Sequence, residues 1–544
     1  MVALRTKRLM IPGIVLLCSS AEWSHSVIAG ADNVPVVCCG SVAAVIEGPA
    51  AAAEPEGRKI TPKLTPVELE QLQLLDVHIT SARHFDGRKP IRTPGNPAIT
   101  PMTAAHVKVD GVIGGTIQFE LLLPDEWNGR FAMGGGGGFV GRVSNLIRDS
   151  VNNGYATAGT DTGHQSPSGR TAAWALDHLE AQVNYGHLAI HRTALAAKAI
   201  ISAWYGRESR YCYFFGCSTG GGQALIEAQR YPADFDGIIS AAPVVQHTGL
   251  AAARLYNALK LFPDPARIET PIITEEQLTK LNEEVLRVCD EQDGVRDGIL
   301  DDPRQCRFDL TQMEWLTPTQ RDALQALYDG PANESGQIYP GMPLGSEGRW
   351  YLWKAGANPG YLTRDKYPNP GFALGIEFCK YFIFNDPNWD YSSYDMANWQ
   401  SDSHRAGTLL NANNPDLSRF RESGGKLILW HGWNDGPLTP LASIEYYENV
   451  ERLDPEIRDF FRFYLLPGVR HCGGGPGPDR VDWLSVLGRW VEEGIAPERL
   501  IASKIDAAGN ATTTRTIYPY PLRAVYNGTG STDEAENFVL PASQ

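Results

Sequence analysis

The pentapeptide Gly216-Cys217-Ser218-Thr219-Gly220 constrains this chain more than any other feature. It follows the apolar run Tyr211 to Phe215 and precedes a helical segment, Gln223 to Arg230. In such a setting the glycines allow a turn so tight that the serine hydroxyl stands clear of a parallel sheet. The helix N-terminus beneath it favours developing negative charge. The pattern predicts a nucleophile at Ser218 rather than a glycine-rich turn with an incidental serine.

Strands and helices alternate around this turn. Strands are expected at 116–123, 130–133, 155–158, 211–215 and 237–240, and a helix is expected over 186–204. Repeated strand–helix units predict a parallel sheet with helices on both faces. The chain then becomes loop-rich and aromatic, and the alternation resumes with the strand Lys426 to Trp430. We therefore expect an α/β-hydrolase fold with a large lid domain inserted between two strands of the sheet.

The domain boundaries follow from the same pattern. With 544 residues the chain is too long for a single core. The catalytic domain is expected at 66–245 and 423–544, and the lid domain at 246–422. Residues 30–65, rich in Ala, Gly and Pro, are expected to form a disordered leader.

The first 29 residues have the features of a signal peptide. Arg5, Lys7 and Arg8 precede the apolar run Leu9 to Cys18, which is too short to span a bilayer. This predicts a secreted or periplasmic protein. The net charge of −15 argues against nucleic acid and against an anionic membrane as partners.

A nucleophilic serine needs a base and an acid that orients the base. In this fold they follow the serine in the order acid, then histidine. Asp435 comes directly after the strand Lys426 to Trp430, and His471 lies in a glycine-rich loop after the next apolar run. Backbone N–H groups of Thr219 and of the run Gly134 to Gly138 are expected to form the oxyanion hole, and Gly137 is the favoured donor within that run.

Several motifs together resemble the tannase and feruloyl esterase family, which includes the hydrolase of mono(2-hydroxyethyl) terephthalate. The resemblance runs from about residue 70 to 540. It rests on the Ser218 turn, the Asp435 loop, His471-Cys472, and the segments Trp127 to Phe131, Asp161 to His164 and Tyr231 to Gly237.

The resemblance also implies a pattern of disulfides. The family joins a cysteine before the serine to one after the histidine, which here are Cys217 and Cys472. If serine and base meet, their neighbours come within the Cα separation that a disulfide allows. Cys289 and Cys306 are expected to form a second bond. The family's usual pairs near both termini are absent, and the pairing of Cys38, Cys39, Cys212 and Cys379 stays open.

An acidic loop lies in the expected lid. It contains Asp290, Asp293, Val295, Asp297 and Ile299, between Cys289 and Cys306. Alternating carboxylates and backbone carbonyls suit Ca²⁺, although the spacing is not that of an EF-hand, and a solvated acidic turn is the alternative. The resemblance implies a structural Ca²⁺ at this loop.

Most of the lid's many aromatic residues are expected in the lid core, and a few of them are candidates for a flat slot that takes a phenolic acyl group. The resemblance implies a stacking tryptophan, which is Trp350 or Trp353, and Arg364 is the candidate for binding a carboxylate or phenol. The substrate expected is a small aromatic ester, with feruloyl, galloyl and terephthaloyl groups left open. A general carboxylesterase and a non-catalytic binding protein of the same fold are the alternatives, and the sequence predicts no oligomeric state.

Overall fold

The computed structural model describes residues 60–92 and 100–541. The chain divides into two units, Met1–Arg58 and Lys59–Gln544, and all of the described residues belong to the second. The predicted signal peptide and most of the predicted leader lie outside the described residues. The leader predicted over residues 30–65 extends too far, because Ile60 pairs with Trp127 and Thr65 caps helix α1 (Pro66–Glu70). These backbone contacts make residues 60–65 part of the folded unit.

A nine-stranded sheet forms the centre of this unit, in the order β1-β2-β3-β5-β4-β6-β7-β10-β11. The pairs from β5 to β11 are parallel, whereas β1–β2, β2–β3 and β3–β5 are antiparallel. The sheet was expected to be parallel, but β1, β2 and β3 form an antiparallel edge. The strands are β1 (Val77–Phe85), β2 (His106–Ile113), β3 (Ile117–Pro124), β4 (Arg130–Gly134), β5 (Ala156–Thr160), β6 (Tyr211–Cys217), β7 (Gly237–Ala241), β10 (Lys426–Gly432) and β11 (Phe461–Leu466).

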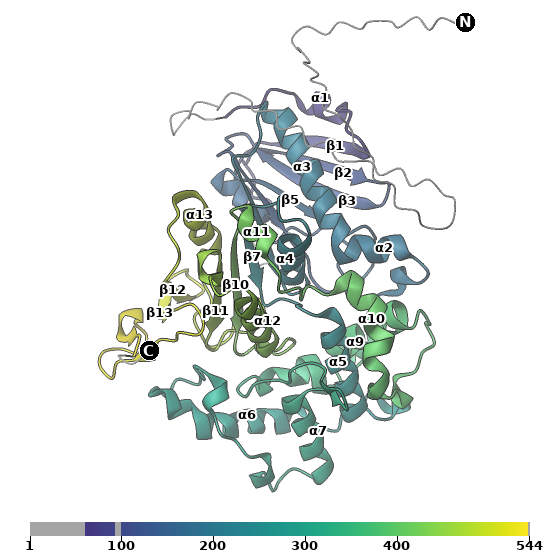
Figure 1. The fold of residues 1–544 in the computed structure, drawn as a ribbon, viewed down its shortest axis with the longest axis vertical. Helices are drawn as coiled ribbons and strands as arrows, with labels where there is room; N and C mark the ends of the chain where they lie inside the picture. The colour runs from purple at the N-terminus through teal and green to yellow at the C-terminus, as the bar shows by residue number, and fades with distance from the viewer. Residues whose placement is uncertain (1–59, 93–99, 542–544) are drawn as a thin grey trace, which may run out of the picture. The chain divides into compact units, whose positions relative to one another are not determined.

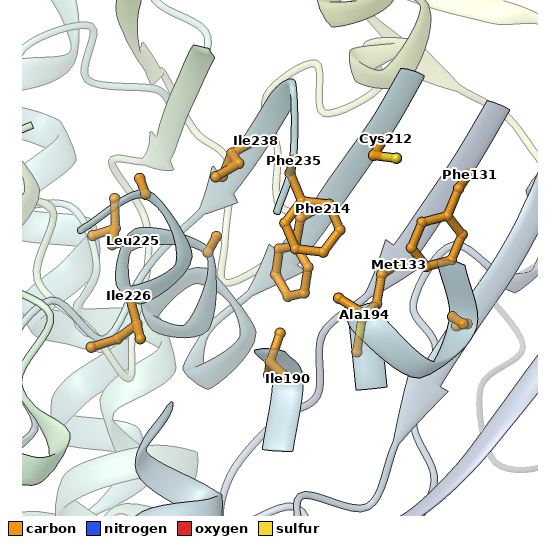
Figure 2. Close-up of a cluster of buried hydrophobic side chains, with 14 of the residues drawn as sticks. Phe131, Met133, Ile190, Ala194, Cys212, Phe214, Leu225, Ile226, Phe235 and Ile238 are labelled. Carbon is orange, nitrogen blue, oxygen red and sulfur yellow. The ribbon is translucent and has the colours of Figure 1, made fainter. Parts of the chain in front are cut away.

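Helices cover both faces of the sheet (Figure 1). Helices α3 (Ala189–Tyr205), α4 (Thr219–Arg230) and α12 (Pro440–Leu453) share a core with one face, and α13 (Trp483–Glu493) shares a core with the other. Successive residues of a strand point to opposite faces. Thus Phe131 and Phe214 pack under α3 and α4 (Figure 2), whereas the adjacent Ala132 and Tyr213 pack toward α13.

The lid lies between β7 and β10, at the predicted place. It is helical, whereas the sequence pattern predicted a loop-rich segment. The helices are α5 (His247–Leu261), α6 (Glu275–Cys289), α7 (Pro318–Asp329), α8 (Pro359–Asp365), α9 (Pro370–Phe378), α10 (Trp399–Leu410) and α11 (Ser418–Glu422), with a short hairpin of β8 (Ala332–Asn333) and β9 (Gly336–Gln337). Four of its helices, α6 to α9, begin at a capping Thr or Asn, and three of these four also have Pro at the first position. These residue types are also typical of turns, so the sequence pattern did not distinguish the helices from loops.

The lid has its own apolar core, which includes Trp350 and Trp399. Figure 1 shows α5, α6, α7, α9 and α10 gathered on one side of the strands β7 to β11. Phe139 and Tyr185, from the catalytic domain, belong to this lid core. The lid is thus packed directly on the loop that follows β4.

The remaining elements are small. The pair β12 (Leu500–Ile505) and β13 (Ala511–Ile517) forms an antiparallel hairpin, and β14 (Val525–Tyr526) pairs with β15 (Phe538–Val539). Helix α2 (Leu179–Val183) continues through a π-helical turn into α3. Within the described ranges no helix combines the length and the apolar character needed to cross a bilayer.

Candidate active site

Ser218 occupies a sharp turn between β6 and α4. Its φ is 63° and its ψ is −123°, a backbone conformation that residues other than glycine rarely adopt. A Cβ atom at Gly216 would lie 2.0 Å from the carbonyl oxygen of Gly220, so only glycine allows this close approach. The predicted elbow is therefore present, with Ser218 at the N-terminus of α4.

Asp435 and His471 are brought together at the ends of β10 and β11. The Nδ1 atom of His471 lies 2.6 Å from Oδ2 of Asp435. The same oxygen lies 3.1 Å from Nε2 of His431, and the Leu438 N–H donates to Oδ1 of Asp435 at 2.8 Å. Asp435 is fully buried, so the three contacts replace the water that its carboxylate loses.

The electrostatics of Asp435 follow from these contacts. Burial disfavours its charged form, but attraction to His471 and hydrogen bonds to His431 and His471 outweigh burial and hold the pKa of Asp435 well below its usual range. Asp435 is therefore ionised at neutral pH. With Nδ1 of His471 bound to this carboxylate, Nε2 is the ring nitrogen left for proton transfer.

The predicted disulfide between Cys217 and Cys472 is confirmed, with a Cα–Cα separation of 5.9 Å. It joins the residue before Ser218 to the residue after His471. Ser218 and His471 line the same cavity, although the structure records no hydrogen bond between the Ser218 hydroxyl and the His471 ring. Such catalytic hydrogen bonds are often long in ligand-free enzymes and shorten when substrate binds.

The cavity at Ser218 has a volume of about 270 Å³. Its walls come from the loop after β4, from α5 and from the lid segment around Trp353. Aromatic side chains from three elements, Phe139, Trp353 and Phe378, contribute to these walls. A space of this size and composition fits one aromatic ring with a short substituent better than a long chain.

The loop after β4 is held by hydrogen bonds to its carbonyl groups. The hydroxyls of Thr219 and Tyr185 donate to the Gly138 oxygen at 2.9 Å and 3.1 Å. The imidazole Nε2 of His164 lies 2.9 Å from the Phe139 oxygen. A Cβ at Gly138 would meet the Gly169 oxygen at 2.4 Å, which explains the glycine there.

The two predicted oxyanion donors, Thr219 and Gly137, both line the cavity. Within the described residues, neither backbone N–H has a hydrogen-bond acceptor, whereas the N–H groups of Gly135 and Gly136 are bonded to Phe215 and Gln223. Free N–H groups beside a nucleophile are the arrangement that an oxyanion hole requires.

Two predicted substrate-binding residues, Trp350 and Arg364, lie outside the cavity. Trp350 is fully buried in the lid core, where its Nε1 donates to Ser346 at 2.9 Å, and it does not line the cavity. The other candidate, Trp353, lines the cavity and lies edge-on to His471, with ring centroids 6.3 Å apart. Arg364 has a side chain that is 59% exposed and pairs with Asp365 at 3.0 Å outside the cavity.

The acidic loop follows α6 and is closed by the predicted Cys289–Cys306 disulfide. Asp290 accepts from the N–H groups of Gly298 and Ile299, and Asp293 from those of Val295 and Asp301. Asp297 pairs with Arg515 at 2.8 Å. The loop is thus folded around its own carboxylates.

Charge in this loop is poorly compensated. Burial above all, and the nearby Asp297, raise the pKa of Asp293 to about 6. Burial and Asp293 raise that of Asp301 to about 7, and Oδ2 of Asp301 is buried without a hydrogen bond, with Arg523 3.6 Å away. Among the described residues no three His, Cys, Asp or Glu side chains form a metal site by themselves. A cation here would need the backbone carbonyls of Val295 and Ile299 as well, and the oxygen-only donor set fits a hard cation such as Ca²⁺.

Some residues at the site were not predicted. Tyr185 and Arg254 reach the cavity from helices far from the motifs, and no local signal marks them. The Nδ1 atom of His431 lies 2.8 Å from the Ser443 hydroxyl, in a fully buried position. Cys212 and Cys379 are buried and form no disulfide with another described cysteine, and Cys38 and Cys39 lie outside the described residues.

A mostly parallel sheet with a serine elbow after β6, an acid after β10 and a histidine after β11 defines an α/β-hydrolase of the serine type. The tannase and feruloyl esterase family model matches residues 103–540. The chain belongs to this family and is a carboxylic ester hydrolase.

Individual proteins agree with this assignment. A probable feruloyl esterase of Arthroderma benhamiae is 32% identical over 471 residues, covering 80% of this chain and 84% of that protein. The mono(2-hydroxyethyl) terephthalate hydrolase of Piscinibacter sakaiensis is 29% identical over 497 residues, covering 78% of this chain and 81% of that protein. The crystal structure of feruloyl esterase B from Aspergillus oryzae superposes with a TM-score of 0.77 at 25% identity, covering 88% of this chain and 100% of that one.

Proposed function

We propose that the protein is a secreted esterase that hydrolyses esters of aromatic, phenolic acids through an acyl-enzyme on Ser218. The observation that carries this proposal is the meeting of the Ser218 elbow and the His471–Asp435 pair at one cavity with aromatic walls. The relatives named for feruloyl esters support the acyl class, and the cavity volume of about 270 Å³ supports a single ring.

The mechanism follows from the positions of these groups. Nε2 of His471 takes the proton of Ser218 as Oγ attacks the ester carbonyl, and Asp435 stabilises the resulting imidazolium. The Thr219 and Gly137 N–H groups stabilise the oxyanion. His471 then gives its proton to the departing alcohol. Water attacks the acyl-enzyme by the same steps and releases the acid.

The decisive experiment compares rates for methyl ferulate, methyl gallate and a terephthalate monoester, with p-nitrophenyl acetate as the test for general carboxylesterase activity. Ser218→Ala should lower kcat by about 10⁴-fold or more on every substrate. Near-normal turnover by Ser218→Ala would refute the proposal. Binding of aromatic esters without turnover by the wild-type protein would instead support a non-catalytic binding protein.

We also propose that a structural Ca²⁺ binds the loop closed by Cys289 and Cys306. Asp290, Asp293 and Asp297 would supply carboxylate oxygens, and Val295 and Ile299 backbone carbonyls. The mutual repulsion of these carboxylates supports the proposal, because a bound cation would compensate it. The Asp297–Arg515 pair connects this loop to strand β13.

Export is the third part of the proposal. The basic and apolar character of the first 29 residues supports it. The two disulfides support it as well, because such bonds persist mainly in oxidising compartments. N-terminal sequencing of the protein recovered outside the cytoplasm tests it, and an intact Met1 would contradict it.

A further inference from the structure

The carbonyl oxygen of Gly138 accepts two side-chain hydrogen bonds beside the expected oxyanion hole. The Thr219 hydroxyl donates to it at 2.9 Å and the Tyr185 hydroxyl at 3.1 Å. These three residues line the cavity at Ser218, and so does Gly137, the second expected donor to the oxyanion. One donor is enough to satisfy a buried carbonyl, so the second hydroxyl adds restraint at this position.

The loop after β4 has little packing to keep it in place. It is a run of glycines, and a Cβ atom at Gly137 would meet no atom beyond its chain neighbours within 4 Å. Glycine also has more conformational freedom than any other residue. An oxyanion hole, however, requires an N–H group that already points at the place where negative charge develops. The direction of the Gly137 N–H must therefore be fixed by hydrogen bonds.

The peptide that joins Gly138 to Phe139 is restrained at both ends. Its N–H donates to the Gly169 oxygen at 2.7 Å, and its carbonyl oxygen accepts from the two hydroxyls. This peptide cannot rotate unless these bonds break. The Gly137 N–H lies one residue earlier in the chain, so its direction depends on the same bonds.

Tyr185 is kept in the donor form by its surroundings. It is 3% exposed, and burial raises the pKa of its hydroxyl well above the usual range, so the phenol keeps its proton. Its other polar neighbour is Nε2 of His247, at 3.4 Å. The Nδ1 atom of His247 donates to the Leu410 oxygen at 3.0 Å, and burial lowers the pKa of this histidine to about 4, so the ring is neutral. The nearer acceptor for the Tyr185 proton is the Gly138 oxygen.

The backbone also presents Tyr185 in an unusual way. Tyr185 lies in the π-helical turn Asn184–Leu188, between α2 and α3. Such turns are rare and occur frequently at functional sites. Its ring packs edge-on to Phe139, with centroids 6.2 Å apart, and lies 5.4 Å from the ring of Trp174. The hydroxyl is therefore held at a fixed place beside the loop.

We infer that the Tyr185 hydroxyl, together with the Thr219 hydroxyl, positions the oxyanion hole by holding the Gly138 carbonyl. Tyr185 is thus a positioning residue, which acts through the Gly137 N–H. This inference rests on the proposed function, because it requires the oxyanion to form at the Thr219 and Gly137 N–H groups. Acylation and deacylation both pass through such an oxyanion, so kcat should depend on Tyr185 whichever step is slower.

The test removes the two hydroxyls singly and together. Tyr185→Phe and Thr219→Val keep the side-chain size and every backbone N–H, and each should lower kcat for p-nitrophenyl acetate by about tenfold. The double variant leaves the Gly138 oxygen without a side-chain donor and should lose about 10²- to 10³-fold, the effect of one lost oxyanion donor. Thr219→Ser restores a hydroxyl and should recover most of the loss of Thr219→Val.

Inhibitor binding separates positioning from a general loss of structure. The Oγ atom of Ser218 adds to the carbonyl carbon of trifluoroacetophenone, its proton passes to Nε2 of His471, and the ketone oxygen becomes an oxyanion in the hole. Acetophenone has the same ring but binds without this adduct. The Ki of the trifluoromethyl ketone should rise in each variant by the factor by which kcat/KM falls. The Ki of acetophenone should stay unchanged, because the walls that bind the ring are intact.

The matched control is Tyr205→Phe, at the end of α3. The Tyr205 hydroxyl also makes a buried hydrogen bond to a backbone carbonyl, that of Pro124 at 2.7 Å, but Tyr205 does not line the cavity. This variant should lose a similar amount of stability in guanidinium and keep the wild-type kcat and both Ki values. If the double variant does not fold, the kcat of Tyr185→Phe against that of Tyr205→Phe decides.

Two results would overturn the inference. One is a double variant that is no slower than Thr219→Val alone, which would mean that Tyr185 plays no part in the hole. The other is an equal rise in the Ki of both ketones, which would mean a structural role. Failure of the proposed function looks different, because Ser218→Ala would then keep its turnover.

Discussion

Removal of the Cys217–Cys472 disulfide should lower both the stability and the kcat of this enzyme. The two cysteines are 255 residues apart in sequence. For a loop of this length the chain-entropy relation gives roughly 5.5 kcal/mol of stabilisation at 25 °C, as an upper estimate. The variant with both Cys217→Ala and Cys472→Ala should therefore unfold at a much lower guanidinium concentration than the wild type.

The effect on kcat comes from the position of His471. Cys472 has a φ of 60°, and three glycines with positive φ, Gly473 to Gly475, follow it, so the loop has few side chains to hold it. Hydrogen bonds from the loop to the carboxylates of Asp435 and Asp479 still restrain it. A displacement of His471 by about 1 Å can cost roughly 10²-fold in rate, and we expect a loss of that order in kcat.

The second disulfide provides the control. Cys289 and Cys306 are 17 residues apart, and the same relation gives roughly 3 kcal/mol for this loop. The variant with both Cys289→Ala and Cys306→Ala should lose stability but keep its kcat.

Rates for a p-nitrophenyl ester, measured where fluorescence shows each variant to be folded, separate the two effects. Unchanged kcat in the Cys217/Cys472 variant would refute the positioning argument, and a free thiol at either residue in the unreduced protein would refute the bond.

The remaining predictions concern the acid, the metal and one buried lysine. Asp435→Asn should lower kcat by about 10⁴-fold while the fold survives, because His471 loses the carboxylate that fixes its tautomer; full activity would contradict this role. Chelation of Ca²⁺ should lower Tm, by an amount equivalent to about 2.7 kcal/mol if the free ion was at 100 times its Kd. The Asp293→Asn variant should not respond to chelation. A metal analysis that finds no calcium in the purified protein would count against the site. Burial, and after it repulsion from Arg254, lowers the pKa of Lys354 from 10.5 to about 7. Between these two pH values the unfolded state binds more protons than the folded state, so the free energy of unfolding should rise with pH. Lys354→Met should flatten that rise in denaturation curves, and an unchanged slope would show that Lys354 is not its source.

The sheet could be predicted from the sequence only where the chain alternates regularly. The strands from β4 to β7 and the strand β10 lie at the predicted places, because each is an apolar run bounded by turn residues. The strand β3 also lies at its predicted place, but its antiparallel pairing was missed, because an apolar run does not state the direction of its partner. The strands β1 and β2 were not predicted. The helical nature of the lid was missed because its short helices depend on tertiary packing more than on periodicity.

The sequence by itself determined the order of the reactive groups and the cysteines beside them. Ser218, Asp435 and His471 each follow a strand of a parallel sheet, and the carboxyl ends of such strands meet at one edge, so their order along the chain specifies the site. Only the tertiary structure decided which lid residues face that site. Trp350 and Trp353 are three positions apart, yet one fills the lid core and the other lines the cavity. Likewise Arg254 lines the cavity, whereas Arg364 does not. The lid core and the cavity wall use the same residue types, so the sequence does not distinguish them. The direction of each side chain depends on the helices packed around it.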